Sequence, residues 1–295
     1  MTMSASHQSR PDETGLSRED PGASSSLPLP HLRPYSAEWY AAVRAILGDG
    51  GCKQLGYYEI RADFLLSVVV PIYNEEANIR RVVDRVRAVP IRKEIVLVDD
   101  HSSDDSVAVI TQLLADMKDD PQNQVRAIFH ERNRGKGAAL RTGFDDTSGD
   151  IIIVQDADLE YYPEEYFLMA EPILDGRADV VYGTRFLGTH RVFLYWHYVG
   201  NRFLTWVTNI LYNTMLSDME TCFKMCRGEI FRSLRLEANR FGFEPEFTAK
   251  VFKKGYKVYE VPISYNGRGY EEGKKITWRD GVAALWFLLK FRFGD

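Results

Sequence analysis

Between residues 66 and 155, stretches typical of buried strands alternate with stretches typical of amphipathic helices. The strand-like stretches are residues 66–72, 94–99, 125–129 and 150–155, and the helix-like stretches are 75–89, 105–117 and 135–144. Strands that alternate with helices predict a parallel sheet, because right-handed crossovers return the chain to the same end of the sheet. The sequence therefore predicts a three-layer α/β/α fold with a mostly parallel central sheet.

The rest of the chain divides into segments of different character. Further strands are expected at residues 178–183, 221–226 and 257–263, with helices after Pro163, at 244–255 and at 277–291. A long aromatic region runs from 195 to 215. We predict a disordered tail (1–33), a helical extension and linker (34–63), one α/β domain (64–265), and a basic loop with a C-terminal amphipathic helix (266–295). In the extension, Ser36 is expected to cap a helix that ends at Gly48.

Composition excludes several classes of protein. The net charge of −5 argues against a general nucleic-acid binder, so we expect no nucleic-acid partner. The three cysteines form no C-x-x-C pair, which indicates neither a disulfide framework nor a zinc site and fits a reducing cytoplasm. No run approaches the ~18 apolar residues of a membrane span, and the first residues do not resemble a signal peptide. We expect a protein that is not integral to a membrane.

Two acids, Asp156 and Asp158, directly follow the apolar stretch 151–154. Alternate residues of an extended segment point the same way, so these carboxylates can converge on one hard cation such as Mg²⁺ or Mn²⁺. Such a cation can bridge a diphosphate. The alternative is that both acids are solvated turn residues.

The ends of the first two strands carry residues suited to a nucleoside. Pro71 stops ladder pairing, and the turn that follows exposes polar backbone groups and Tyr73. Asp100 follows the second strand and is placed to accept hydrogen bonds from a base or ribose. Open α/β sheets bind ligands at this edge. No G-x-G-x-x-G follows the first strand, which disfavours a nicotinamide dehydrogenase.

The third strand is followed by Gly135-Lys136-Gly137 at an expected helix start. Free backbone amides and the helix dipole favour anions there. The spacing is not that of a Walker loop. With the D-A-D acids, four successive strand ends then carry ligand-binding residue types.

Read in order, VVVPIYNEE, EIVLVDDHSSDDS, RNRGKGAALRTGF and IIIVQDADLEYYPEE resemble glycosyltransferase family 2, which has a GT-A fold. GTRF (183–186) and VPISYNGRGYEEGKKI (261–276) look like its polyprenyl-phosphate (dolichyl-phosphate) mannosyl- or glucosyltransferase branch. The resemblance covers about residues 66–293. It implies that Asp156 and Asp158 hold Mg²⁺ or Mn²⁺ on the donor diphosphate. The candidate donor-binding residues are Pro71, Tyr73, Glu75, Asp100, Lys136, Gln155 and Asp156.

The chain departs from that branch in three places, one of which is an N-terminal extension of about 60 residues. Where the branch often reads D-x-T-G-S-F, this sequence has DMETCF over residues 218–223. Many members carry a pair of C-terminal transmembrane helices, and this chain ends at Asp295 without them. We therefore expect peripheral contact with the inner face of the membrane, through an amphipathic surface or a membrane-protein partner.

In the implied reaction, negative charge grows on the leaving diphosphate, and cations must meet it. The candidate cations are Arg185, Arg202, Arg268, Lys274 and Lys275. Glycines beside the last three indicate a loop that closes over phosphates, the alternative being a solvated basic loop.

The acceptor decides whether the reaction needs a general base. A phosphate monoester is largely ionised at neutral pH and attacks unaided, whereas a hydroxyl needs a carboxylate base. Asp218 and Glu220 are the candidates for that base. With a lipid phosphate as acceptor, they would instead position the donor sugar or orient a basic residue.

Aromatic and basic residues alternate in residues 195–212 and 286–293, a composition that suits a bilayer interface, although core packing explains it equally well. The sequence thus predicts a metal-dependent inverting transferase that moves glucose or mannose from a UDP- or GDP-linked donor to a polyprenyl phosphate at the cytoplasmic membrane face. Two alternatives stay open. One is a transferase acting on a soluble, glycan or protein hydroxyl with Glu220 or Asp218 as base, and the other is a nucleotide-sugar-binding protein without turnover.

Overall fold

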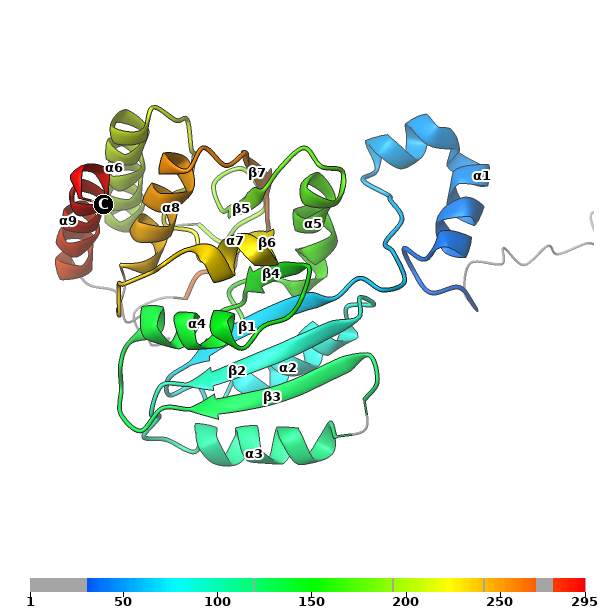
Figure 1. Cartoon of the computed structure of the whole chain (residues 1–295), viewed down its shortest axis with the longest axis horizontal. Coiled ribbons are helices and arrows are strands. Elements are labelled where there is room, and N and C mark those ends of the chain that lie inside the picture. The colour runs from blue at the N-terminus through cyan, green and yellow to red at the C-terminus, as the bar shows by residue number, and fades with distance from the viewer. Residues whose placement is uncertain (1–30, 119, 193, 241, 269–277, 295) are drawn as a thin grey trace, which may run out of the picture.

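The computed structural model describes residues 31–118, 120–192, 194–240, 242–268 and 278–294. Within these ranges the strands form one sheet in the order β3-β2-β1-β4-β6-β5-β7 (Figure 1). The strands are β1 (Leu66–Ile72), β2 (Lys93–Asp99), β3 (Asn123–Phe129), β4 (Ile151–Val154), β5 (Val180–Thr184), β6 (Lys224–Arg227) and β7 (Val258–Pro262). β6 runs antiparallel to β4 and β5, and the other pairings are parallel. The predicted mostly parallel α/β sheet is confirmed.

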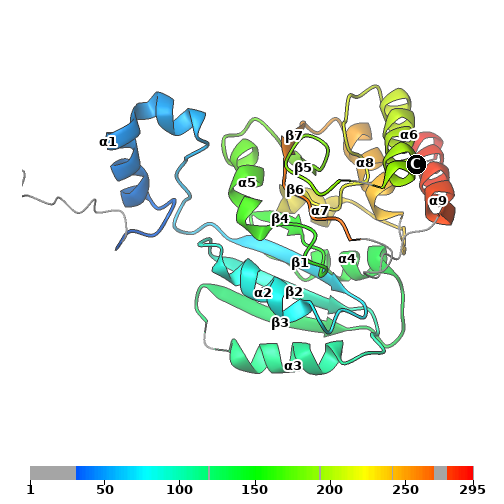
Figure 2. The ribbon, with the colours of Figure 1, turned by 180° about the vertical axis from the view of Figure 1, so that it is seen from behind.

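Helices cover both faces of this sheet. They are α1 (Ala37–Gln54), α2 (Ile79–Ala88), α3 (Ser106–Asp116), α4 (Lys136–Asp145), the 3₁₀ turn η2 (Pro163–Glu165), α5 (Tyr166–Leu174), α6 (Tyr195–Tyr212), α7 (Gly228–Ser233), α8 (Phe243–Lys253) and α9 (Trp278–Phe293). α2, α3 and α5 pack on one face, which Figure 2 shows from the front. α4, α7 and α8 pack on the other, with α6 and α9 joining them at one end (Figure 1).

β1 lies at the centre of both cores. Val68 and Val70 pack into the layer with α2 and α3, whereas Val69 packs into the layer with α4. All three valines are fully buried, as expected for a parallel strand covered on both faces.

The register of the central strands places their carboxyl ends together. The amide of Asp100 donates to the carbonyl of Ile72 over 2.8 Å, and that of Gln155 donates to the carbonyl of Val69 over 3.0 Å. The residues that follow β1, β2 and β4 therefore leave the sheet side by side, which is the arrangement that builds the site.

The N-terminal helix lies away from this edge (Figure 1). Ser36 caps it as predicted, because its hydroxyl accepts from the amide of Trp39 over 3.2 Å. The predicted end at Gly48 is instead a kink, with Gly48 at φ +69° and helix continuing to Gln54. Tyr35 stacks on Phe167 of α5 with ring centroids 3.8 Å apart, which ties the extension to the sheet domain.

The structure leaves two sequence-based expectations untested. The predicted domain boundaries at residues 63/64 and 265/266 stay predictions, and nearly all of the predicted tail 1–33 lies outside the described residues. In the described ranges, no helix combines the length and the apolar character that crossing a membrane requires.

Candidate active site

A cavity of about 1150 Å³ opens at the carboxyl ends of β1, β2 and β4. Most of the predicted site residues line it, namely Pro71, Tyr73, Glu75, Asp100, Lys136, Asp156, Asp158, Arg185, Glu220 and Arg268. Gln155 is buried behind its wall, where Oε1 accepts from the hydroxyl of Tyr166 over 2.8 Å and Nε2 donates to the carbonyl of Asp156. Lys274 and Lys275 lie outside the described residues.

Asp100 holds the loop between β3 and α4. Its carboxylate accepts from the amides of Arg134 and Gly135, over 2.8 and 2.6 Å. Nδ1 of His130 lies 2.7 Å from the same carboxylate. Asp100 therefore fixes the loop that forms one side of the cavity, in addition to lining the cavity itself.

The two glycines around Lys136 allow close packing with residues 238–240, and the expectation that this loop binds an anion stays a prediction. The amide of Gly135 donates to Asp100, and that of Ala138 donates to the carbonyl of Asn239 over 3.2 Å. A Cβ on Gly135 would lie 2.3 Å from the carbonyl oxygen of Asn239, and one on Gly137 would lie 2.2 Å from that of Ala238. Only glycine allows residues 238–240 to pass this close.

Lys136 sits between three groups of the cavity wall. Its Nζ lies 2.8 Å from Oδ1 of Asp156, 3.4 Å from Oε1 of Glu244 and 2.9 Å from Sγ of Cys222. Burial alone would lower the pKa of Lys136, but the neighbouring Asp156, Cys222 and Glu244 raise it well above its usual value. Lys136 is therefore a fixed positive charge. Glu244 was not predicted, because an acid in the first turn of a helix is ordinary in sequence.

The carboxylates of Asp158, Glu160 and Glu75 all contact the guanidinium group of Arg268. Nη2 of Arg268 donates to Oδ2 of Asp158 over 2.8 Å, and the same side chain reaches Glu160 at 3.3 Å and Glu75 at 3.5 Å. Burial, followed by the charges of Glu160 and Asp156, raises the pKa of Asp158 to about 7, against the opposing effect of Arg268. Glu160 was missed, although it follows Asp158 at the same two-residue spacing.

This donor set fits a divalent cation. Asp156 and Asp158 present carboxylate oxygens, which Mg²⁺ and Mn²⁺ prefer. The raised pKa of Asp158 reflects its burial and the neighbouring charges of Glu160 and Asp156, which a bound cation would offset. Mg²⁺ is commonly held by one or two carboxylates together with substrate phosphates. The residues present are thus consistent with a metal that arrives with a diphosphate.

Asp218 is committed to Arg185. Nε and Nη2 of Arg185 each donate to one oxygen of Asp218 over 2.7 Å, and the Arg185 amide adds a third bond of 3.1 Å. Asp218 is fully buried, whereas Arg185 lines the cavity. Of the two expected uses of Asp218, the contacts favour orienting a basic residue over acting as a base.

Glu220, unlike Asp218, lines the cavity. Its Oε1 is buried and has no hydrogen-bond partner among the described residues. Burial, followed by the charges of Glu244 and Asp218, raises the pKa of Glu220 to about 8, while Lys224 and Arg185 act against the shift. The carboxyl is therefore mainly neutral at pH 7.

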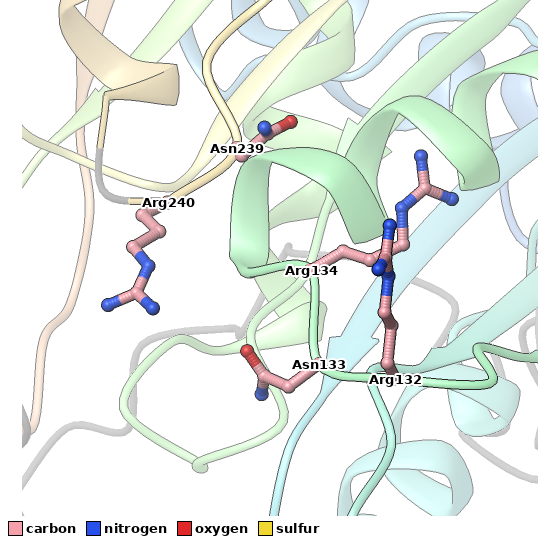
Figure 3. A pocket seen from close by; sticks show the side chains of 5 residues that line it. All are labelled: Arg132, Asn133, Arg134, Asn239 and Arg240. Atoms are coloured by element: carbon pink, nitrogen blue, oxygen red, sulfur yellow. The ribbon is translucent and has the colours of Figure 1, made fainter.

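A shallower basic pocket of about 460 Å³ adjoins the cavity. It is lined by Arg132, Asn133, Arg134, Asn239 and Arg240. Figure 3 shows Asn133 and Arg240 on one side of the β3–α4 loop, and the side chains of Arg132 and Arg134 extending on the other. Asn133 and Arg240 also line the main cavity, so the two pockets share part of their lining. Arg240 was not predicted from the sequence.

The aromatic segments form α6 and α9, which lie side by side at one end of the molecule in both views (Figures 1 and 2). The core-packing interpretation is confirmed for one side of these helices, and the bilayer-interface interpretation stays a prediction for the other side. Leu288 is buried in the core, whereas Trp196, Trp206 and Trp286 are 79%, 59% and 64% exposed. Trp196, Phe203 and Val282 line the cavity as well. The exposed apolar surface thus continues into the cavity wall.

The family model described as Glycosyl transferase family 2 matches residues 67–239. The chain belongs to glycosyltransferase family 2. This membership confirms the family and the enzyme class expected from the motifs.

Curated relatives match only part of the chain. Residues of this protein are 42% identical over 104 positions to the undecaprenyl-phosphate 4-deoxy-4-formamido-L-arabinose transferase of Yersinia pestis (strain Pestoides F). The match covers 34% of this chain and 31% of that relative, and the same enzyme of Yersinia pseudotuberculosis serotype O:3 matches to the same extent. The chain thus spans about a third of the length of these curated relatives.

Solved structures confirm the GT-A fold. Glucosyl-3-phosphoglycerate synthase from Mycobacterium tuberculosis, in complex with Mn²⁺, UDP and phosphoglyceric acid, superimposes with a TM-score of 0.59 at 20% identity, covering 91% of this chain and 87% of that one. S. aureus TarS 1–349 in complex with UDP-GlcNAc gives a TM-score of 0.54 at 17% identity, over 77% and 66% of the two chains. At these identities the likeness concerns the fold.

Proposed function

We propose that this glycosyltransferase moves a hexose, glucose or mannose, from a UDP- or GDP-linked donor to a polyprenyl phosphate, with Mg²⁺ or Mn²⁺ held by Asp156 and Asp158. The observation that carries the proposal is a cavity whose lining runs from these acids to exposed aromatic residues of α6 and to Val282 of α9. A charged nucleotide-sugar donor needs the polar end of this cavity, and a lipid acceptor needs its apolar end. The match to an undecaprenyl-phosphate sugar transferase supports the same acceptor class.

The donor end of the cavity has groups for each part of a nucleotide sugar. Tyr73 and Pro71 offer a surface for the base, next to the loop that Asp100 fixes. Lys136 pairs with Asp156, and Arg268 pairs with Asp158. The metal, when bound, neutralises charge that develops on the leaving diphosphate. The two basic side chains contribute to the same stabilisation from fixed positions.

A phosphate acceptor accounts for the state of the remaining acids. A phosphate monoester, with a second pKa of about 6, is largely ionised at neutral pH and attacks without a base. Asp218 is engaged by Arg185, and Glu220 is mainly neutral, so neither is a ready proton acceptor. These two observations favour the lipid phosphate over a hydroxyl acceptor.

The outer sides of α6 and α9 would then lie against the membrane. They combine exposed tryptophans with Lys290 and Arg292 near the end of α9, a composition that suits the interface of an anionic bilayer. We propose that the protein acts peripherally at the cytoplasmic face.

A lipid-extraction assay tests the function. The purified chain receives Mg²⁺ or Mn²⁺, a radiolabelled UDP-hexose or GDP-hexose, and undecaprenyl or dolichyl phosphate in detergent. Metal-dependent transfer of label into the organic phase is expected with one donor. Label that appears only on water-soluble hydroxyl acceptors would contradict the proposal.

A further inference from the structure

Two carboxyl groups of the cavity wall, Glu220 and Glu244, lie outside the set proposed to hold the metal and the diphosphate. Glu220 belongs to the loop before β6, and Glu244 to the first turn of α8. Both line the cavity, and Glu244 is 3% exposed. They are also close enough that the charge of Glu244 raises the pKa of Glu220.

Among the described residues, neither carboxyl group has a hydrogen-bond partner at every acceptor position. Oε1 of Glu220 has no partner among the described residues, although its atom is buried. Glu244 contacts Lys136 at 3.4 Å and Sγ of Cys222 at 3.2 Å, both through Oε1. A carboxylate has about four acceptor positions. A buried polar group without a partner costs about 1–3 kcal/mol, so a ligand that satisfies it gains affinity and selectivity.

The contacts of Lys136 relate Glu244 to the place proposed for the diphosphate. The same ammonium group is 2.8 Å from Asp156 and 3.4 Å from Glu244. If Asp156 and Asp158 hold the metal and diphosphate, the group attached to the β-phosphate reaches the wall formed by Glu244 and Glu220. In a nucleotide sugar that group is the sugar ring.

We infer that Glu220 and Glu244 together read the hydroxyl pattern of the donor's sugar, and so determine which sugar the enzyme accepts. The inference rests on the proposed function, because it places a nucleotide sugar in the cavity. Glu220 in its neutral form both donates and accepts a hydrogen bond, and Glu244 offers acceptor oxygens beside Lys136. The pair suits a neutral sugar with neighbouring hydroxyl groups. A site built this way rejects an epimer because its buried groups would then be left unpaired.

Equilibrium binding to the full chain in the presence of Mn²⁺ tests the inference. Dissociation constants are measured for UDP and GDP alone, and for UDP-glucose, UDP-galactose, UDP-xylose and GDP-mannose. The variants are Glu220→Ala, Glu220→Gln, Glu244→Gln and Glu244→Asp. Glu229→Gln is the matched control, because Glu229 is an exposed acid on α7.

Glu220→Ala and both Glu244 variants should bind the preferred sugar nucleotide about tenfold more weakly, the equivalent of one hydrogen bond of about 1.4 kcal/mol. Affinity for the diphosphate alone should stay within about twofold, which also shows that the variants fold. Glu220→Gln should retain most of the discrimination, because an amide still donates and accepts. Glu229→Gln should match the wild type.

Two results would overturn the inference, and they are distinguishable. If the wild type discriminates between sugars and all variants keep its ratios, the pair does not read the sugar, while the proposed function stands. If the wild type binds no sugar nucleotide, the proposed function fails and the inference fails with it.

Discussion

Nζ of Lys136 lies 2.8 Å from Oδ1 of Asp156, so the lysine of the third strand-end loop pairs directly with the first acid of the D-A-D motif. Asp158, the second acid, pairs at 2.8 Å with Arg268 from near the C terminus. Each acid therefore has its own cation at the place proposed for the diphosphate. If Asp156 and Asp158 hold a metal and a diphosphate, Lys136 and Arg268 would lie close to the phosphate oxygens, where fixed positive charge lowers a barrier.

Replacing Lys136 with methionine tests this arrangement. The Lys136→Met variant keeps most of the side-chain volume but leaves Asp156 and Glu244 without their shared cation. We expect kcat to fall on the order of a hundredfold, as when one fixed donor is removed from a site of charge development. Steady-state transfer kinetics measure the change. Lys254→Met, at an exposed position after α8, is the control, and equal activity of the two variants would remove Lys136 from the mechanism.

Asp158→Asn should separate metal binding from stability. Burial, together with Glu160 and Asp156, already disfavours the ionised form of Asp158, so a neutral amide should not lower the melting temperature at pH 8. Metal-dependent turnover should nevertheless be lost, because an amide is a poorer ligand for Mg²⁺. Thermal unfolding and Mn²⁺ titration provide the two measurements.

The control for that variant is Asp145→Asn, which changes an exposed acid at the end of α4. It should behave as the wild type in both measurements. Full turnover by Asp158→Asn would contradict the proposed place of the metal.

The sheet and much of the cavity were predictable because local patterns determine them. Stretches rich in β-branched apolar residues, such as 66–72, indicate strands buried on both faces, and parallel connections then bring Asp100, Lys136 and Asp156 to one edge. The order of the motifs along the chain also indicated glycosyltransferase family 2. These inferences needed no knowledge of long-range packing.

What was missed depends on contacts between distant segments. Glu244 and Arg240 reach the cavity because the segment 238–244 crosses the start of α4, which no local pattern indicates. The meaning of Gly135 and Gly137 was missed for the same reason. Because these glycines lack a side chain, the carbonyl groups of Ala238 and Asn239 can pack against them, although they lie about a hundred residues further along the chain.

Gly137→Ala tests that close approach. The new Cβ would lie 2.2 Å from the carbonyl oxygen of Ala238, so the loop and the crossing segment must separate. We expect a loss of about 1–3 kcal/mol in the free energy of unfolding, typical of an overpacked site. Urea unfolding measures it. In Gly50→Ala the added Cβ meets no atom within 4 Å, so this helical control should be neutral or slightly more stable.

The pH dependence of stability tests the state of Glu220. Burial, and then Glu244, raises its pKa from 4.5 to about 8 in the folded chain. Between these values the folded chain holds a proton that the unfolded chain has released, so this group's contribution to stability is present at low pH and is lost as pH rises through about 8. Glu220→Gln does not titrate. The stability of the wild type relative to this variant should therefore fall between about pH 5 and about pH 8.5.

Urea unfolding of both proteins across that range gives the comparison. Parallel curves would show that Glu220 titrates normally and is ionised at neutral pH. The same variant then decides between acceptors. If Glu220 were a general base for a hydroxyl, Glu220→Gln would abolish turnover, whereas a neutral carboxyl that binds the donor sugar is replaced by glutamine with activity largely kept.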